Sequence, residues 1–291
     1  MPELFPIASR TWDTSYSVAQ QDAATEALEA GNVLFFPHLT FGLEEHERAF
    51  LSPDTVRNSK NISHDPASGK VGGTDVAGMK LEELRTLLAQ FAAASQHLLH
   101  QIVPSYRSGM RQGRTSLRPV ETAGRQTSWR KDDTRLHVDS FPSMPMSGRR
   151  ILRVFSNINA DGKPRVWRIG GPFHEVADRF WQALRTPSNG TNLLRYAFRV
   201  TKSFRTPYDD YMLQLHDRMK EDQEYQAHGN QMRFDFPAGS TWIVFTDQVP
   251  HAAMSGIHLL EQTYYLPVSS LQEQQTAPLR VLESLARRKL A

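Results

Sequence analysis

The N-terminal third of the chain carries apolar residues at helical spacing. From Leu81 to Val103 they recur every three or four positions, which predicts an amphipathic helix with one buried face. A second helix is predicted from Ser17 to Ala30, because a serine suits its N-cap and Gly31 suits its stop. The continuous apolar run Val33 to Pro37 then predicts a buried strand, and Leu43 to Leu51 a short helix.

Beyond residue 110 the pattern changes to short runs typical of strands. The helical spacing of Pro172 to Leu184 and of Pro207 to Tyr225 interrupts these runs. Helices followed by many short strands predict a mainly β protein with helices (α+β), in which a double-stranded β-helix of the jelly-roll or cupin-like kind packs against N-terminal helices. The predicted strands are Thr115 to Val120, Thr127 to Lys131, Ile151 to Asn159, Val166 to Ile169, Gln231 to Phe236, Thr241 to Phe245 and Leu259 to Leu266.

This pattern predicts a single domain over residues 1–291. We expect a helical support over 1–110, a β-helix core over 111–270 with a helical insertion at 172–225, and an amphipathic helix at 277–291. Residues 52–79 are polar and rich in turn formers, so no element is predicted there. A lid over a site and a disordered loop are both compatible with such a segment.

Composition excludes several classes of protein. The chain has 291 residues, no cysteine and a formal net charge of +3, so disulfides and thiolate metal sites are absent and nucleic-acid binding is not indicated. No apolar run is long enough to span a membrane. The N-terminus lacks a basic stretch followed by an apolar one, so we expect no secretory signal and a cytoplasmic protein.

The candidate chemistry lies in His137-Val138-Asp139 and in His251. Two imidazoles and one carboxylate form the ligand set that holds a non-haem ferrous ion and leaves its other face open. His137 stands where a strand runs out into a proline-rich loop, whereas His251 follows a predicted hairpin far along the chain. Only a closing barrel brings them together. The alternative for each histidine is an ordinary surface or hydrogen-bonded residue.

Basic residues concentrate around the first part of this motif. A cationic wall beside a metal site indicates an anionic substrate or cosubstrate, and a solvated surface is the alternative. Between residues 107 and 153 the acidic residues are Glu121, Asp132, Asp133 and Asp139. The basic residues of the same stretch are Arg107, Arg111, Arg114, Arg118, Arg125, Arg130, Lys131, Arg135, Arg149, Arg150 and Arg153.

Four segments together resemble one family. Leu28 to Pro37, His137 to Ser143, Arg149 to Asn159 and Gln248 to Ala253 are similar to the Kdo hydroxylases, and the similarity extends over nearly the whole chain. These enzymes are Fe(II)- and 2-oxoglutarate-dependent dioxygenases. They hydroxylate C3 of 3-deoxy-D-manno-oct-2-ulosonic acid (Kdo) in the lipopolysaccharide inner core of some Gram-negative bacteria.

The resemblance implies a catalytic centre in which His137, Asp139 and His251 bind Fe(II). It also implies 2-oxoglutarate as cosubstrate and O2 as oxidant. Many members of the superfamily bind the distal carboxylate of 2-oxoglutarate through an arginine on the strand after the second histidine. That strand reads Glu261-Gln262-Thr263-Tyr264 here and offers no cation.

The strand after the His-x-Asp motif supplies the cation in some relatives. Arg153 lies 16 positions after His137, so we expect Arg153 to bind the cosubstrate. A guanidinium can form two parallel charge-assisted bonds to a carboxylate. Arg150 is the competing residue.

The resemblance also implies the substrate, a Kdo unit attached to lipid A. Kdo carries a carboxylate near the lipid A phosphates, and we expect Arg130 and Arg135 to contact it. The alternatives are a small acid or peptide as substrate, or a non-catalytic cupin-like sugar-binding domain.

The tail Pro278 to Leu290 alternates apolar and basic residues. It could rest on the inner face of the inner membrane as a peripheral contact, or dock its apolar side on the barrel. The sequence indicates no oligomeric state.

Overall fold

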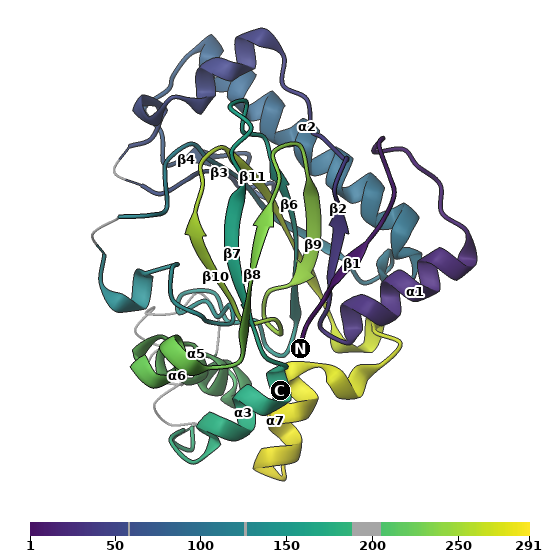
Figure 1. Ribbon diagram of the computed structural model, residues 1–291, viewed down its shortest axis with the longest axis vertical. Coiled ribbons are helices and arrows are strands. Elements are labelled where there is room, and N and C mark those ends of the chain that lie inside the picture. Colours follow the sequence, from purple (N-terminus) through teal and green to yellow (C-terminus); the bar gives the residue numbers. More distant parts are fainter. Residues whose placement is uncertain (58, 125–126, 188–204) are drawn as a thin grey trace.

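Two β-sheets face one another at the centre of the protein (Figure 1). The computed structural model describes residues 1–57, 59–124, 127–187 and 205–291. Within these residues the larger sheet has the order β1 (Leu4–Pro6), β2 (Val33–Phe36), β9 (Thr241–Phe245), β6 (Arg150–Asn157), β11 (Leu259–Leu266), β5 (Arg111–Arg118), β3 (Ile62–His64) and β4 (Val71–Gly72). The smaller sheet has the order β10 (His251–Ser255), β7 (Arg165–Gly170) and β8 (Gln231–Phe236).

Two long helices and a group of shorter ones surround the sheets. Figure 1 shows α1 (Val18–Glu29) and α2 (Met79–Ile102) beside the larger sheet. It also shows α3 (Phe173–Trp181), α5 (Pro207–Glu221), α6 (Gln223–His228) and α7 (Pro278–Ala286) gathered at one end of the sheets. The short 3-10 turns are η1 (Glu45–Leu51), η2 (Pro53–Thr55), η3 (Pro104–Tyr106), η4 (Trp129–Lys131), η5 (Val268–Ser270) and η6 (Gln274–Thr276).

Apolar packing occurs in two places. Leucines of α2 pack against the larger sheet, and the Tyr264 hydroxyl of β11 donates a hydrogen bond to the Ala92 carbonyl of α2 at 3.0 Å. Between the sheets lies an aromatic cluster in which the rings of Phe236 and Trp242 stack with centroids 4.1 Å apart. Stacked and edge-to-face rings of this kind bury much surface with defined geometry. The two faces of the barrel therefore meet over a rigid apolar base.

The helix ends follow the capping residues of the sequence. The Ser17 side chain accepts a hydrogen bond from the Gln20 backbone, while the Gln20 side chain accepts one from the Ser17 backbone. This capping box begins α1 as predicted. Thr206 and Asp209 form the same arrangement at the start of α5, with Pro207 as its first residue.

The two facing sheets and the helices beside them confirm the predicted jelly-roll core and its N-terminal helices.

Residues 127–131 differ from the prediction of a strand. They contain the 3-10 turn η4, in which the Arg130 guanidinium lies 4.0 Å from the Trp129 ring centroid. The Lys220 ammonium of α5 donates to the Arg130 carbonyl, so this carbonyl is satisfied by a helix instead of a neighbouring strand. Among the described residues, no strand of either sheet pairs with residues 127–131, so the strand prediction was wrong here.

Two other differences concern strand bounds. The sequence did not predict β1 or β10, which are short, and β10 begins at His251 directly after a proline. The strand predicted from residue 115 begins earlier, at Arg111, and ends at Arg118. Pro119 follows at once and cannot donate a ladder hydrogen bond, which explains the end.

The polar segment 52–79 adds strands to the larger sheet. Its strands β3 and β4 form an antiparallel pair, and β3 also pairs with β5, with Ser63 opposite Ser116. Asn58 of this segment lies outside the described residues. Of the predicted insertion at 172–225, α3, α5 and α6 are described, and residues 188–204 lie outside the described part. Because β3 pairs with both β4 and β5, residues 60–72 extend the larger sheet and form one wall of the barrel.

The C-terminal helix docks on the protein. Leu279 and Leu282 of α7 are buried with the apolar residues of α3 and α5. Glu283 accepts a hydrogen bond from the Leu290 backbone, and the Leu290 carbonyl accepts one from the Tyr208 backbone. Among the described residues, the structure contains no helix with the length and apolar character needed to cross a membrane. The apolar side of the tail is thus occupied by the fold itself.

We predict that Leu282→Ala lowers the free energy of unfolding by about 2–5 kcal/mol, because the fully buried leucine leaves a cavity between α7 and the helices beneath it. Urea denaturation followed by far-ultraviolet circular dichroism measures the change. Ser284→Ala, on the exposed side of the same helix, is the matched control. An unfolding midpoint equal to that of the control would contradict the docked position of α7.

Candidate metal centre

A backbone bridge between His137 and His251 builds the candidate site. The His137 N–H donates to the His251 carbonyl at 3.1 Å, and the His251 N–H donates to the His137 carbonyl at 2.9 Å. These bonds place the two imidazole rings with centroids 4.8 Å apart. The Asp139 N–H donates to the Thr246 carbonyl at 2.8 Å, which holds the loop after His137 beside β9. Closure of the barrel therefore unites the three predicted ligands.

The three side chains offer one ligand atom each to a common point. Their candidate ligand atoms all lie within 4.8 Å of one another. Nδ1 of His137 lies 2.7 Å from the Arg135 carbonyl, and Nδ1 of His251 lies 2.9 Å from the Val249 carbonyl. Because a carbonyl only accepts, each Nδ1 carries the proton and each Nε2 keeps a free lone pair. This donor set fits a divalent metal ion.

Burial keeps the histidines neutral. It lowers the pKa of His137 well below the ordinary value, with a further contribution from the ammonium of Lys220, and it lowers the pKa of His251. Burial alone raises the pKa of Asp139, but the Arg153 guanidinium and the imidazoles outweigh burial and hold this pKa below its usual range. At neutral pH all three groups are in the protonation state that binds metal.

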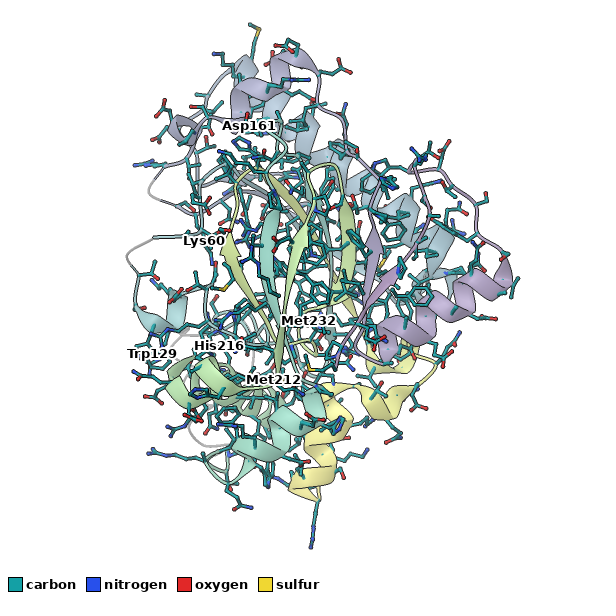
Figure 2. The ribbon with its side chains drawn as sticks, in the orientation of Figure 1. Lys60, Trp129, Asp161, Met212, His216 and Met232 are labelled. Carbon is teal, nitrogen blue, oxygen red and sulfur yellow. The ribbon has the colours of Figure 1, made fainter. Side chains whose placement is uncertain are left out.

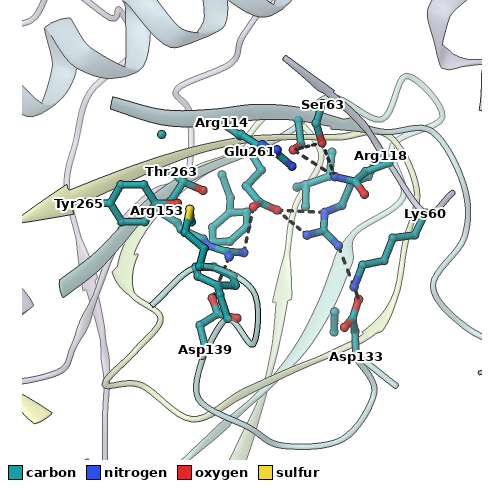
Figure 3. A pocket seen from close by; sticks show the side chains of 18 of the residues that line it. Lys60, Ser63, Arg114, Arg118, Asp133, Asp139, Arg153, Glu261, Thr263 and Tyr265 are labelled. Atoms are coloured by element: carbon teal, nitrogen blue, oxygen red, sulfur yellow. Dashed lines mark hydrogen bonds and ion pairs between the residues drawn. The ribbon is translucent and has the colours of Figure 1, made fainter. Parts of the chain in front are cut away.

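The Arg153 guanidinium lies between two carboxylates (Figure 3). One of its terminal nitrogens is 3.1 Å from Oδ2 of Asp139, and the other is 2.9 Å from Oε1 of Glu261. Arg153 comes from β6 and Glu261 from the neighbouring strand β11. The predicted cosubstrate residue therefore stands directly beside a predicted metal ligand, with part of its charge already neutralised.

The same line of charges continues away from Asp139. Glu261 accepts a hydrogen bond from Arg118 of β5 at 2.6 Å, and Arg118 lies 3.7 Å from Asp133. Asp133 accepts a hydrogen bond from the Lys60 ammonium at 2.6 Å. Burial alone raises the pKa of Glu261, but Arg118 and Arg153 lower it below its usual range. Positive and negative side chains thus alternate along one wall, and each stabilises the next in its charged form.

A cavity of about 540 Å³ opens above the three ligands. This volume falls within the range of small-molecule sites in proteins. The Trp167 ring forms one side of the cavity, where it stacks on the His251 ring with centroids 5.1 Å apart. The cavity residues besides the triad are mostly polar and include Lys60, Asn61, Ser63, Asp65, Gln112, Arg114, Ser116, Arg118, Asp133, Arg153, Arg165, Glu261, Thr263 and Tyr265.

Arg165 is a cavity residue that the sequence analysis missed. Its side chain is almost wholly buried at 1% exposure, and it donates a hydrogen bond to the Gly256 carbonyl. Among the described residues, no carboxylate forms an ion pair with it. Burial, together with the neighbouring Arg118 guanidinium, lowers the pKa of Arg165 to about 10. One sequence signal could have found it, since Arg165 directly precedes the predicted strand Val166 to Ile169 and shares the face of Trp167 two positions on.

The competing residue Arg150 lies elsewhere. It is fully buried and donates to Asp247 at 2.7 Å and to Gln248 at 2.6 Å, while its guanidinium lies 3.9 Å from the Phe245 ring centroid. Arg150 does not line the cavity. Arg150 therefore forms a buried ion pair with Asp247 that belongs to the fold. Its side chain lies on the side of β6 that faces away from the metal centre.

The structure does not bring Arg130 and Arg135 to the cavity. Arg130 is exposed over 61% of its side chain and pairs with Asp217 at 3.0 Å. Figure 2 places its neighbour Trp129 near α5 and His216, away from Lys60. Arg135 donates to Asp132 at 3.3 Å and to the Lys220 carbonyl at 2.8 Å. Both arginines were predicted as substrate residues, but Arg130, in the η4 turn, and Arg135, after it, each contact a residue of α5. The basic residue Arg125 lies outside the described residues.

We predict that metal affinity falls only below pH 6.5, the ordinary imidazole pKa. A protonated imidazole cannot bind a metal, and burial keeps both histidines neutral to a lower pH than a free imidazole. Calorimetric titration with Co(II), a stable substitute for Fe(II), at pH values on both sides of 6.5 measures this. His251→Ala serves as the control without a complete site. Half-loss of affinity above pH 6.5 would contradict the neutral state of the two imidazoles.

Comparisons with known proteins agree with this geometry. Residues 11–289 match the family model described as 3-deoxy-D-manno-oct-2-ulosonic acid (Kdo) hydroxylase. No curated protein matches the chain significantly. Among solved structures, the Kdo hydroxylase KdoO with α-ketoglutarate (2-oxoglutarate) and Fe(III) is 48% identical, with a TM-score of 0.96, over 100% of this chain and 98% of that chain.

Two further structures of KdoO, a non-haem Fe(II) α-ketoglutarate-dependent dioxygenase, are similar to the same degree. The apo form is 49% identical with a TM-score of 0.97 over 100% of this chain and 97% of that one. The cobalt(II) complex is 49% identical with a TM-score of 0.96 over 99% of this chain and 97% of that one. The family model and these structures cover essentially the whole chain, and the chain therefore belongs to the Kdo hydroxylase family.

Proposed function

We propose that this protein is an Fe(II)- and 2-oxoglutarate-dependent dioxygenase that hydroxylates C3 of a Kdo unit attached to lipid A. The observation that carries the proposal is the convergence of His137, Asp139 and His251 at the base of a cavity that several arginines line. Membership of the Kdo hydroxylase family supports the sugar substrate. The products are the 3-hydroxylated sugar, succinate and CO2.

The three protein ligands suit this reaction because they occupy one face of an ion. A 2-His-1-carboxylate set leaves positions open for a cosubstrate and for O2, and the bound iron supplies the oxidising chemistry. The chain's own residues position the two substrates and exclude water. Trp167 stacks on His251 and covers one side of the site, while the Arg135 and Val249 carbonyls fix the orientation of the imidazoles.

The deeper cations of the cavity suit the distal carboxylate of 2-oxoglutarate. Arg153 is 3.1 Å from Asp139 and is thus within the length of a small dicarboxylate from the metal position. Arg165 lies on the facing strand β7 and has no carboxylate partner among the described residues. An unpaired buried guanidinium is costly unless an anion neutralises it. We infer that Arg153 binds the cosubstrate and that Arg165 faces the same anion.

We predict that Arg153→Ala weakens 2-oxoglutarate binding by roughly ten- to a hundred-fold, because a hydrogen bond to a charged group contributes about 1.5–3 kcal/mol. An anaerobic titration of the Fe(II) protein with 2-oxoglutarate, followed by its charge-transfer absorption, measures this. Metal content is determined in parallel, since Arg153 also contacts a ligand of the metal. Arg111→Ala, an exposed arginine outside the cavity, is the control.

The outcome for Arg165→Ala decides how the two cations share the role. A loss of affinity in Arg165→Ala together with unchanged affinity in Arg153→Ala would assign the carboxylate to Arg165 and overturn the role of Arg153. Arg150→Ala is expected to destabilise the fold and leave the cosubstrate affinity of the folded protein unchanged, because its ion pair with Asp247 lies outside the cavity.

We predict that the purified protein adds one oxygen atom to a Kdo unit of Kdo-containing lipid A, with one succinate formed per event. The incubation contains Fe(II), ascorbate, 2-oxoglutarate and the glycolipid, and mass spectrometry locates the added oxygen on the sugar. His251→Ala, which lacks a metal ligand, is the inactive control. Succinate formed with some other acid while the glycolipid mass stays unchanged would overturn this substrate in favour of a small acid or peptide.

A lipid-linked substrate also bears on where the protein acts. We propose that it works at the inner face of the inner membrane as a peripheral protein. The support is electrostatic, since Arg287, Arg288 and Lys289 at the end of α7 are exposed. Such residues are attracted to anionic lipids. The apolar side of the helix is buried and does not contribute.

A further inference from the structure

The cavity extends beyond the metal centre over a polar part of the larger sheet. On β3, β5 and the residues just before β3, the Asn61 amide donates to Ser63 Oγ at 2.9 Å and to Ser116 Oγ at 3.1 Å. The two serine hydroxyls lie 3.1 Å apart. All three residues line the cavity. A group of neighbouring amide and hydroxyl groups can exchange hydrogen bonds with the hydroxyls of a sugar.

Arg114 stands beside this group and has unused donors. Its side chain is 58% exposed, and its single ion pair within the described residues is with Asp65 at 3.7 Å, which is too long for a hydrogen bond. Lys60, the other exposed cation of the cavity, is instead held by Asp133 at 2.6 Å. Figure 3 shows Arg114 and Ser63 on the side of the pocket away from Asp139. Arg114 is thus the cation that a large ligand meets beyond the metal.

The backbone of β5 is irregular at this residue. Thr115 pairs with Gln262, whereas Gln112 pairs with Tyr264, so β5 carries one extra residue at Gly113 and Arg114. A Cβ atom at position 113 would lie 2.8 Å from the Tyr265 ring, so a residue without a side chain, glycine, fits this position best. Bulges next to active sites re-aim a side chain. This bulge is placed where it sets the direction of Arg114.

The balance of charge in the cavity allows for one more anion. Its lining contains five cationic side chains (Lys60, Arg114, Arg118, Arg153 and Arg165) and four acidic ones (Asp65, Asp133, Asp139 and Glu261). The charges of Fe(II) and of the 2-oxoglutarate dianion cancel. One positive charge therefore remains for the substrate, which matches a single carboxylate.

We propose that Arg114, Asn61, Ser63 and Ser116 form the sugar subsite, in which Arg114 binds the carboxylate of the acidic sugar and the other three residues bind its hydroxyls. This inference rests on the proposed function and assigns the residues that determine its substrate specificity. The planar guanidinium gives two parallel bonds to a carboxylate, which a neutral sugar cannot accept. Arg114 is a substrate-binding residue and is distinct from the deeper arginines that face the cosubstrate.

The first test compares Arg114→Gln with Arg111→Gln, an exposed arginine of the same strand that does not line the cavity. With Kdo-containing lipid A and saturating 2-oxoglutarate, kcat/KM should fall about ten- to a hundred-fold in Arg114→Gln and stay unchanged in the control. Arg114→Lys should lie between them, because it keeps the charge and loses the paired bonds. The affinity of the Fe(II) protein for 2-oxoglutarate should be the same in all variants.

The second test identifies the group that Arg114 binds. The wild type should lose most of its kcat/KM when the Kdo carboxylate is a methyl ester, whereas Arg114→Gln should treat acid and ester alike. The effect of Arg114→Gln should persist on a glycolipid without lipid A phosphates. If that effect vanishes without the phosphates, or if wild type and variant discriminate equally against the ester, the carboxylate assignment is overturned.

The outcomes separate this inference from the function on which it rests. Hydroxylated glycolipid formed equally well by wild type and Arg114→Gln would overturn the subsite and leave the proposed function intact. Succinate without any glycolipid product in the wild type would overturn both. Reduced 2-oxoglutarate affinity in Arg114→Gln would move the residue to the cosubstrate site, and the subsite proposal would fall.

Discussion

The pair of backbone hydrogen bonds between His137 and His251 is the constraint on which the rest of the site depends. His137 and His251 are too far apart in the sequence for local structure to bring them together. The closed barrel places them opposite each other, and the two backbone hydrogen bonds hold them there as an antiparallel bridge. The bridge sets the ring separation, and the Asp139 N–H bond to Thr246 sets the third ligand. A substitution that opened the barrel would remove the metal site without changing any ligand.

Mutual neutralisation allows so many charges to lie beneath the surface. A single buried ion costs several kcal/mol, and this cost is offset only where a partner is close and well oriented. Arg153, Glu261 and Arg118 satisfy that condition one after another across the neighbouring strands β6, β11 and β5, and Asp139 joins them from the loop after His137. Arg165 lacks such a carboxylate among the described residues, so a bound anion would offset the cost of burying its charge. The order of charges thus prepares the pocket for anionic ligands.

The two ends of the pocket are built differently, in a manner that suits two ligands of different size. Near the metal, buried arginines and the Trp167 ring surround a space suited to a small dicarboxylate. Farther out, β3 widens the larger sheet and contributes neutral polar groups, with Arg114 re-aimed by the bulge of β5. The end near the metal suits the cosubstrate that the iron chemistry requires. The outer end is where the protein can distinguish its substrate from other acids.

The sequence by itself determined the features that depend on local chemistry. Caps and apolar spacing placed the long helices, and the ligand types of His-x-Asp and the second histidine indicated the metal. Arg153 was reached through the resemblance to known relatives, and its role as cosubstrate residue stays a prediction. The tertiary structure alone decided which charges share a cavity, because the direction of a side chain depends on the strands that pair beside it. That is why Arg130 and Arg135, close to the motif in sequence, point to α5, while Arg165, from a separate strand, faces the metal centre.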